Sequence, residues 1–214
     1  MVIDNMSISL INTKNIKHKK LLKAHRNNIT ISDKNLLDKY TYFEDSKVDE
    51  SRTLLFEIEN KPKNYKRYSR GEIVRVKFGV NIGSEFSGDH FAIVISKQDT
   101  MRNSTLHVIP ITSKKHKKSL EIGPILFNQN EIDKLNKMLN HEKSLKSQKE
   151  ISNVINYYLN RKNVISYACV DHLKTVSKLS VSKTLFKQYD YLPNIKCSDE
   201  IMTKIYQKII DEYI

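Results

Sequence analysis

Three short runs of apolar residues, separated by polar turns, lie in the middle of the chain. Residues 72–78 read EIVRVKF, and apolar and charged side chains alternate in the second half of the run, which predicts a half-buried strand. Residues 91–96 read FAIVIS, a continuous apolar run typical of a strand buried on both faces. Residues 106–112 read LHVIPIT and predict a third strand. Pro110 within it indicates an edge or a bulge, because proline gives no donor to a ladder.

Tight turns are expected around these strands. Four of the five glycines of the chain fall within this segment: Gly71, Gly79, Gly83 and Gly88. Glycine accepts positive φ and lets the backbone approach closely, so a concentration of glycines predicts sharp bends in the sheet.

Beyond residue 124 the spacing of apolar residues becomes helical. The stripe Ile151, Val154, Ile155, Tyr158 and Leu159 predicts an amphipathic helix. A weaker stripe over 132–139 precedes it, and residues 143–150 suggest a charged connector. The run VISYACV at 164–170 predicts a fourth strand, and 173–179 allow a fifth. Ser198 is placed to cap a final helix over 199–213.

The first part of the chain is polar and rich in lysine and asparagine. Leu21 with Leu22, and Leu36 with Leu37 and Tyr40, predict one or two short amphipathic helices; Leu54–Ile58 add a third apolar cluster. Pro62 in a basic run indicates a linker. We therefore expect an accessory helical extension over 1–64 and a main domain over 65–214 with a helical insertion at about 124–163.

Composition argues against a membrane-spanning, secreted or disulfide-rich protein. No stretch of eighteen apolar residues exists to span a membrane, and the first twenty residues lack the pattern of a signal peptide. The two cysteines, Cys169 and Cys197, are too few for a disulfide framework, and Cys169 lies in an apolar run typical of a buried thiol. These features predict a cytoplasmic protein that does not use a membrane.

The net charge of +13 is concentrated in the middle of the chain. Residues 65–121 hold 11 basic against 5 acidic residues, a net charge of +6 in 57 positions. A basic surface attracts polyanions, so nucleic acid is a plausible partner, although a solvated basic face is the common alternative. The chain has no phosphate loop, HExxH, paired CxxC or GxSxG motif, and its seven histidines lack ligand spacing, so we expect neither a metal site nor a cofactor.

Five pieces of the sequence form an ordered set: RGEIVRVKF, NIGSEFSGD, FAIVIS, HVIPITS and CVDHLKTVSKLSV. This set resembles the PemK/MazF family of bacterial toxins, whose members combine an RG(D/E)(I/V) strand, a GSEQ-type loop, an apolar strand and a strand ending in (P/A)(I/L/C)T. The resemblance covers roughly residues 70–113 and 164–181. GSE alone is weak, whereas the ordered set is fairly specific.

The resemblance implies an α+β fold: a small, strongly bent antiparallel β-barrel (PemK/MazF/CcdB-like) with peripheral helices, usually paired as a homodimer. It implies a metal-independent endoribonuclease of a toxin–antitoxin system, which cuts single-stranded RNA such as mRNA or tRNA and is neutralised by an antitoxin. In that reaction the 2′-hydroxyl attacks its own phosphate, leaving a cyclic phosphate and a 5′-hydroxyl.

The sequence departs from the family at one important place. Family members carry a catalytic arginine followed by proline after the loop, where this chain has His90 and Phe91, and Phe86 replaces the glutamine after GSE. Histidine exchanges protons near neutral pH, so His90 is predicted to take over proton transfer, and Asp89 beside it could raise its pKa. The alternative, equally weighted on position alone, is a histidine that caps a buried strand.

Thr112 matches the catalytic threonine of the family, and its hydroxyl could donate to a phosphate oxygen. An ordinary strand threonine is the alternative. By resemblance or position, the predicted RNA-binding residues are Ser84, Ser113, Lys114, Lys115, Lys117, His172 and Lys174. Lys114–Lys118 form a cationic run that could hold the RNA backbone, and Phe86 could stack on an unpaired base.

Two other functions fit the same sequence. The loss of the arginine allows a catalytically inactive nucleic-acid-binding or regulatory module on the same fold. Related barrels poison a protein such as DNA gyrase through a C-terminal helix, and the lysines after Thr112 argue mildly against that reading. Cleavage of RNA in EDTA distinguishes the enzyme from both.

Overall fold

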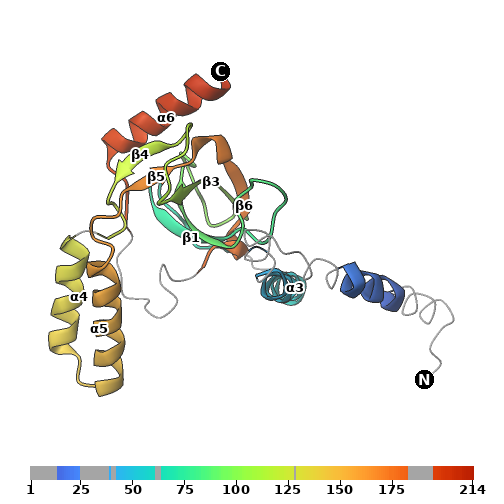
Figure 1. Ribbon diagram of the computed structural model, residues 1–214, viewed down its shortest axis with the longest axis horizontal. Coiled ribbons are helices and arrows are strands. Elements are labelled where there is room, and N and C mark those ends of the chain that lie inside the picture. The colour runs from blue at the N-terminus through green and yellow to red at the C-terminus, as the bar shows by residue number, and fades with distance from the viewer. Residues whose placement is uncertain (1–13, 25–38, 40–41, 61–63, 128, 183–194) are drawn as a thin grey trace.

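The computed structural model describes residues 14–24, 39, 42–60, 64–127, 129–182 and 195–214 (Figure 1). Residues 14–24 are helical, which confirms the helix predicted around Leu21 and Leu22, and helix α3 spans Phe43–Asn60 without a buried residue. The apolar cluster 54–58 is therefore an exposed part of α3. The predicted helix at 36–40 and the linker at Pro62 fall outside the described residues, apart from Lys39.

The sheet contains six strands, and every pairing between them is antiparallel. The strands are β1 (Ile73–Lys77), β2 (Asp89–Val94), β3 (Thr105–Thr112), β4 (Leu120–Gly123), β5 (Ser166–Ala168) and β6 (Lys174–Ser177). Their order is β1-β2-β3-β5-β4, and β6 also pairs with β3. All the strands predicted from apolar runs are present; among the strands of the described residues, the four-residue β4 was not predicted.

The described strands do not close into a barrel. Residues just past β6 return to β1 through one isolated bridge, Val76 to Val181, rather than through a ladder. The structure therefore confirms a mixed fold of helices and antiparallel sheet, but the predicted barrel closure is not confirmed.

Each face of the sheet carries its own apolar core, because successive side chains of a strand point to opposite faces. The larger core contains Ile73, Ile93 and Ile109, together with apolar side chains of helices α4 (Gln129–His141), α5 (Leu145–Leu159) and α6 (Asp199–Tyr213). The smaller core contains Val76, Ala92 and others from the opposite face, and Phe86 packs against it. Burial on both faces explains the continuous apolar run FAIVIS in β2.

Pro110 lies in a central strand, so the edge prediction is wrong. On one side β3 pairs with β2 through Ala92, and on the other side it pairs first with β6 and then with β5. The carbonyl of Pro110 accepts from Cys169 N on the latter side, where β3 changes partner strand. Pro110 lies between the end of the β3–β6 ladder and the start of the β3–β5 ladder and belongs to neither. The missing N–H of proline therefore costs little at this position.

Helices α4 (Gln129–His141) and α5 (Leu145–Leu159) form a hairpin that projects from one end of the sheet (Figure 1). Residues 145–150 belong to α5, so the predicted connector over 143–150 is shorter than expected; Ser144 is the N-cap of the helix. Helix α6 (Asp199–Tyr213) begins after Ser198, whose side chain accepts from Ile201 N as the sequence predicted. Among the helices that the structure describes, none combines the length and hydropathy needed to cross a membrane.

A buried ion pair ties three separate segments together. Lys178 Nζ lies 2.7 Å from Asp99 Oδ2, with side chains only 2% and 1% exposed. The same ammonium donates to the carbonyls of Lys66 and Thr100, and Asp99 also accepts from Tyr68 N. The segment before β1, the loop after β2 and the turn after β6 are thereby joined.

Candidate active site

A glycine-bounded loop over residues 79–88 carries two candidate residues predicted from the sequence, Ser84 and Phe86. Its ends meet through a hydrogen bond from Gly88 N to Gly79 O of 2.6 Å, and both glycines have positive φ, 82° and 73°. The side-chain amide of Asn81 donates to the carbonyls of Phe78 and Phe86, which braces the loop from inside. The loop thus holds Phe86 at one end of the smaller core.

His90 lies at the start of β2, against the ring of Phe86. The two ring centroids are 4.9 Å apart and the rings meet edge to face at 87°. His90 Nε2 lies 2.9 Å from the carbonyl oxygen of Ser87. Because a carbonyl only accepts, Nε2 carries the hydrogen of this bond, and the lone pair of the neutral ring is left on Nδ1.

Burial lowers the pKa of His90 below its usual value, and this effect outweighs the opposing effects of the Ser87 carbonyl and Asp89. Asp89 does raise the pKa of His90, as expected, but burial lowers it by more, so the net shift is downward. Asp89 is also engaged elsewhere, since its Oδ2 lies 3.2 Å from Arg75 Nη2 on the neighbouring strand. A neutral imidazole at neutral pH can accept a proton.

His172 contacts the same phenyl ring as His90, that of Phe86, with ring centroids 5.0 Å apart at 80°. It ends a short 3₁₀ turn, Val170–His172, between β5 and β6. Its Nδ1 lies 3.0 Å from Asp171 Oδ1, and both side chains are 29% exposed. Because a carboxylate only accepts, Nδ1 carries the hydrogen in this bond and Nε2 is left for other partners.

Lys174 also reaches this part of the molecule. It begins β6, and its Nζ lies 3.5 Å from the Oε2 of Glu85, next to Phe86 in the loop. The two side chains are 43% and 61% exposed, so the pair contributes little stability. Glu85, to which the sequence assigned no catalytic role, offsets the charge of Lys174 here.

Thr112 lies at the end of β3, on the same side of the sheet as His90. The β2–β3 ladder ends at Ala92 and Pro110, and His90 and Thr112 are each two residues beyond that pair. The Thr112 hydroxyl accepts from Lys114 N at 3.1 Å, which leaves its hydrogen available to a further acceptor. Within the described part of the chain, the Thr112 hydroxyl and the imidazole of His90 are not joined by a hydrogen bond.

The cationic run follows Thr112 directly and is exposed from Lys114 to Lys118. Lys118 is held by Glu212 at 3.0 Å, whereas Lys114, Lys115 and Lys117 form no ion pair with any carboxylate that the structure describes. Ser84 is exposed as well, as is Ser113, and no described contact joins either of them to the histidines.

The structure therefore brings His90, His172 and Lys174 to the loop that presents Phe86. Ser84, within this loop, and Ser113 with the lysine run, after Thr112, lie at exposed positions.

The role of Asp171 in holding His172 was not predicted from the sequence. The signal was present in the dipeptide Asp171–His172, but neighbouring strand residues point apart, and only the 3₁₀ turn lets the two side chains meet. Among the described residues, no group of three or more potential metal ligands lies together.

Comparison with known proteins identifies a family whose members resemble this chain in sequence. The sequence model of a family described as PemK-like, MazF-like toxin of type II toxin–antitoxin system matches residues 69–210. Among solved structures, a match is the crystal structure of MazF (Form-I) from Deinococcus radiodurans, at 12% identity and a TM-score of 0.37, covering 69% of this chain and 96% of that one. Among the curated proteins, none matches.

Proposed function

Because the chain belongs to the family of PemK-like, MazF-like toxins of type II toxin–antitoxin systems, we propose that it is an endoribonuclease that cleaves single-stranded RNA without a metal ion. The observation that carries the proposal is that two imidazoles contact Phe86 and that the ammonium of Lys174 reaches Glu85 beside it in the loop. Cleavage by the 2′-hydroxyl needs a base, an acid and donors for the phosphate oxygens, and these side chains have that chemistry.

His90 is the proposed general base. Its ring is neutral near pH 7 because burial lowers its pKa, and the Ser87 carbonyl keeps the hydrogen on Nε2. Nδ1 then accepts the proton of the 2′-hydroxyl while the 2′-oxygen bonds to phosphorus. In this way histidine supplies the proton transfer for which the family uses arginine at this position.

Donors to the phosphate come from the end of β3 and the start of β6. The Thr112 hydroxyl has its hydrogen available, and the Lys174 ammonium is exposed and only loosely paired with Glu85. Lys114, Lys115 and Lys117 follow Thr112 and would hold the flanking backbone of the RNA by charge. Phe86 would offer a ring face to an unpaired base.

A toxin of this kind acts inside the cell on mRNA or tRNA, is neutralised by a cognate antitoxin and works as a homodimer. The family supports an antitoxin partner, and the two free, buried thiols of Cys169 and Cys197 suit the reducing cytoplasm. An antitoxin that blocks cleavage would cover the same basic, histidine-bearing surface.

The proposal is tested with the purified full chain and a long, mixed-sequence RNA transcript in EDTA. We expect discrete cleavage products whose new 5′ ends are hydroxyl groups, so that polynucleotide kinase labels them without prior dephosphorylation. His90→Ala is expected to lower the cleavage rate about 10²–10⁴-fold through loss of the base. Thr112→Ala is expected to lower it about 10²-fold or more through loss of a phosphate donor.

The matched control is His107→Ala. His107 is an exposed imidazole on β3 that bonds Thr175, outside the loop and its two histidines. Its removal should leave the cleavage rate unchanged. Binding of RNA by the wild-type chain without any cleavage would instead identify an inactive nucleic-acid-binding module.

A further inference from the structure

The two histidines of the site differ in the nitrogen that each presents. His90 uses Nε2 to bond the Ser87 carbonyl and leaves Nδ1, whereas His172 uses Nδ1 to bond Asp171 and leaves Nε2. The rings come from different elements, the start of β2 and the turn before β6, and one phenyl ring, that of Phe86, contacts both. Each imidazole thus lies about 5 Å from the same phenyl ring, and the two present different nitrogens.

We infer that His172 is the general acid of the proposed cleavage reaction, and that Asp171 is its positioning residue. This inference rests on the proposed function and assigns to His172 a proton transfer to the leaving group rather than a contact with RNA bases. It pairs His172 with His90 as the two proton-transfer groups on one phosphodiester.

The reaction needs two such groups at different positions. In an in-line displacement the attacking 2′-oxygen and the leaving 5′-oxygen lie on opposite sides of phosphorus, so a single imidazole cannot serve both at once. With two rings, the 2′-hydroxyl proton passes to His90 Nδ1 as the bond from oxygen to phosphorus forms. His172 enters this step with a hydrogen on each ring nitrogen, and the bond from phosphorus to the 5′-oxygen breaks as Nε2 gives that oxygen its proton. Afterwards His90 releases its extra proton to water and His172 Nε2 takes one up, which restores both rings.

Asp171 contributes orientation. A carboxylate bonded to one ring nitrogen fixes the tautomer and the plane of an imidazole and directs the other nitrogen to the substrate, as it does in catalytic triads. The 3.0 Å contact between Asp171 and His172 Nδ1 meets this requirement. Both side chains are 29% exposed, so the ring is accessible to a substrate while it is held in place.

A variant that has lost the general acid should be rescued by a substrate whose leaving group needs no proton. After the cleavage site in the transcript has been mapped, two oligoribonucleotides spanning it are made, one with the natural 5′-oxygen and one with sulfur at that bridging position. A thiolate leaves without a proton, so the sulfur substrate does not need the acid. His172→Ala is expected to lower the rate on the oxygen substrate about 10²–10³-fold and the rate on the sulfur substrate less than about tenfold.

Further variants distinguish the roles of base, acid and positioning residue. His90→Ala removes the base and is expected to slow both substrates equally. Asp171→Asn, if Asp171 positions the acid, slows the oxygen substrate and is rescued by sulfur to the same extent as His172→Ala. His172→Gln, which keeps a side chain of similar length, repeats the measurement in case the alanine variant unfolds, and His107→Ala is the control for loss of an unrelated imidazole.

The rates on the oxygen and sulfur substrates decide whether His172 is the acid. Full rescue of His172→Ala and His172→Gln by sulfur supports the acid role. Equal slowing of both substrates, or an unchanged rate on the oxygen substrate, overturns it while the nuclease proposal stands. Failure of the wild-type chain to cleave the transcript in EDTA overturns the proposed function, and the role of His172 with it.

Discussion

At the scale of single residues, the chemistry of the site depends on how each imidazole is held. His90 is packed against Phe86 and Phe78 and bonded to a carbonyl, so burial controls its protonation. His172 is bonded to a carboxylate on a turn that remains partly exposed. The surroundings of these two histidines therefore place the hydrogen of the neutral ring on different nitrogens, Nε2 in His90 and Nδ1 in His172.

The lowered pKa of His90 makes stability depend on pH. The unfolded chain, with a histidine pKa of about 6.5, takes up the proton before the folded chain does. The stability contributed by the neutral ring is therefore present above about pH 6.5 and lost as the pH falls through the folded pKa. We expect His90→Gln to lose less free energy of unfolding than wild type between about pH 7.5 and pH 5, in urea titrations.

His107→Gln provides the comparison, because His107 is exposed on the strand next to β6. This variant should keep the pH dependence of the wild type. The same pH dependence in His90→Gln and wild type would show that the protonation of His90 is not linked to folding.

At the scale of elements, short strands and turns are placed by a few specific contacts. The loop over 79–88 is closed by glycines at positive φ and braced by Asn81, so Phe86 is presented at a defined place. The turn after β6 is placed by Lys178, whose buried ammonium reaches Asp99 and two carbonyls. Lys178, which follows the proposed RNA-binding residues in the sequence, thus serves the fold rather than the substrate.

Removal of Asp99 is expected to be severe because it leaves the Lys178 ammonium buried without its counter-charge. Asp99→Ala should lower the free energy of unfolding by about 3–5 kcal/mol, measured by urea denaturation. Asp99→Leu combined with Lys178→Met should cost less than the sum of the single changes, because no isolated charge remains. Glu50→Ala, which breaks the exposed pair with Lys47 on α3, should change stability by less than about 1 kcal/mol.

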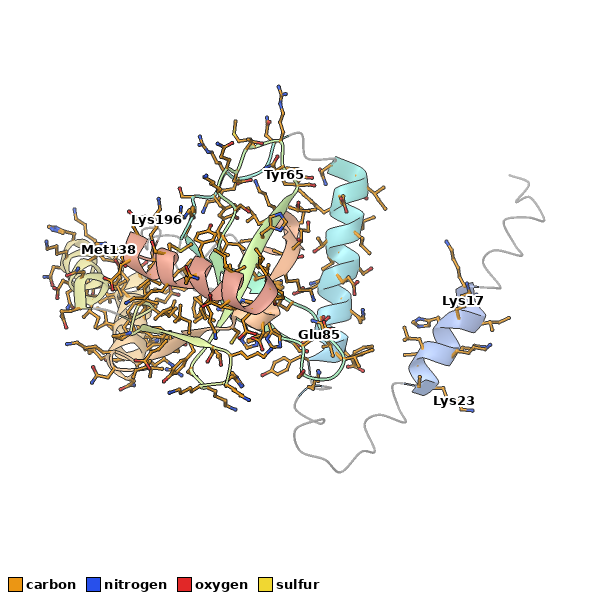
Figure 2. All side chains as sticks on the ribbon, turned by 90° about the horizontal axis from the view of Figure 1, so that it is seen from above. Lys17, Lys23, Tyr65, Glu85, Met138 and Lys196 are labelled. Atoms are coloured by element: carbon orange, nitrogen blue, oxygen red, sulfur yellow. The ribbon has the colours of Figure 1, made fainter. Side chains whose placement is uncertain are left out.

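At the scale of the whole molecule, the α4–α5 hairpin and the loop over 79–88 lie at different ends. The α4–α5 hairpin projects from one end, where Met138 lies, and the loop carrying Glu85 lies at the opposite end, toward α3 (Figure 2). Lysines occur on the hairpin and also at the loop, where Lys174 reaches Glu85, so charge alone does not distinguish the two ends. Within the described part of the chain, the two histidines around Phe86 distinguish the end that carries the loop.

The place of the exposed lysine run after Thr112, together with the proposed function, predicts that these lysines bind RNA. Changing Lys114, Lys115 and Lys117 together to Gln should weaken binding of a 2′-O-methyl oligonucleotide, which lacks the attacking hydroxyl and is not cleaved. The slope of log affinity against log salt should become shallower by about 0.7 for each phosphate that the variant no longer neutralises. Fluorescence anisotropy at several salt concentrations measures both quantities.

The control changes an equal number of charges at the other end of the molecule. Lys137 lies on α4, and Lys146 and Lys149 lie on α5, in the hairpin that contains Met138 (Figure 2). Their change to Gln should leave the salt slope as it is in the wild type. An equal decrease of slope in both triple variants would indicate non-specific attraction by the net charge.

The sequence alone determined the elements of this protein and its family. The strands of EIVRVKF, FAIVIS and LHVIPIT and the cap at Ser198 follow from local alternation and capping chemistry, which neighbouring residues decide. Tertiary structure alone decided that Phe86 touches both histidines, that His90 is buried enough to lower its pKa, and that Lys178 faces Asp99. Those outcomes depend on which distant segments meet across the sheet, and local sequence does not encode that proximity.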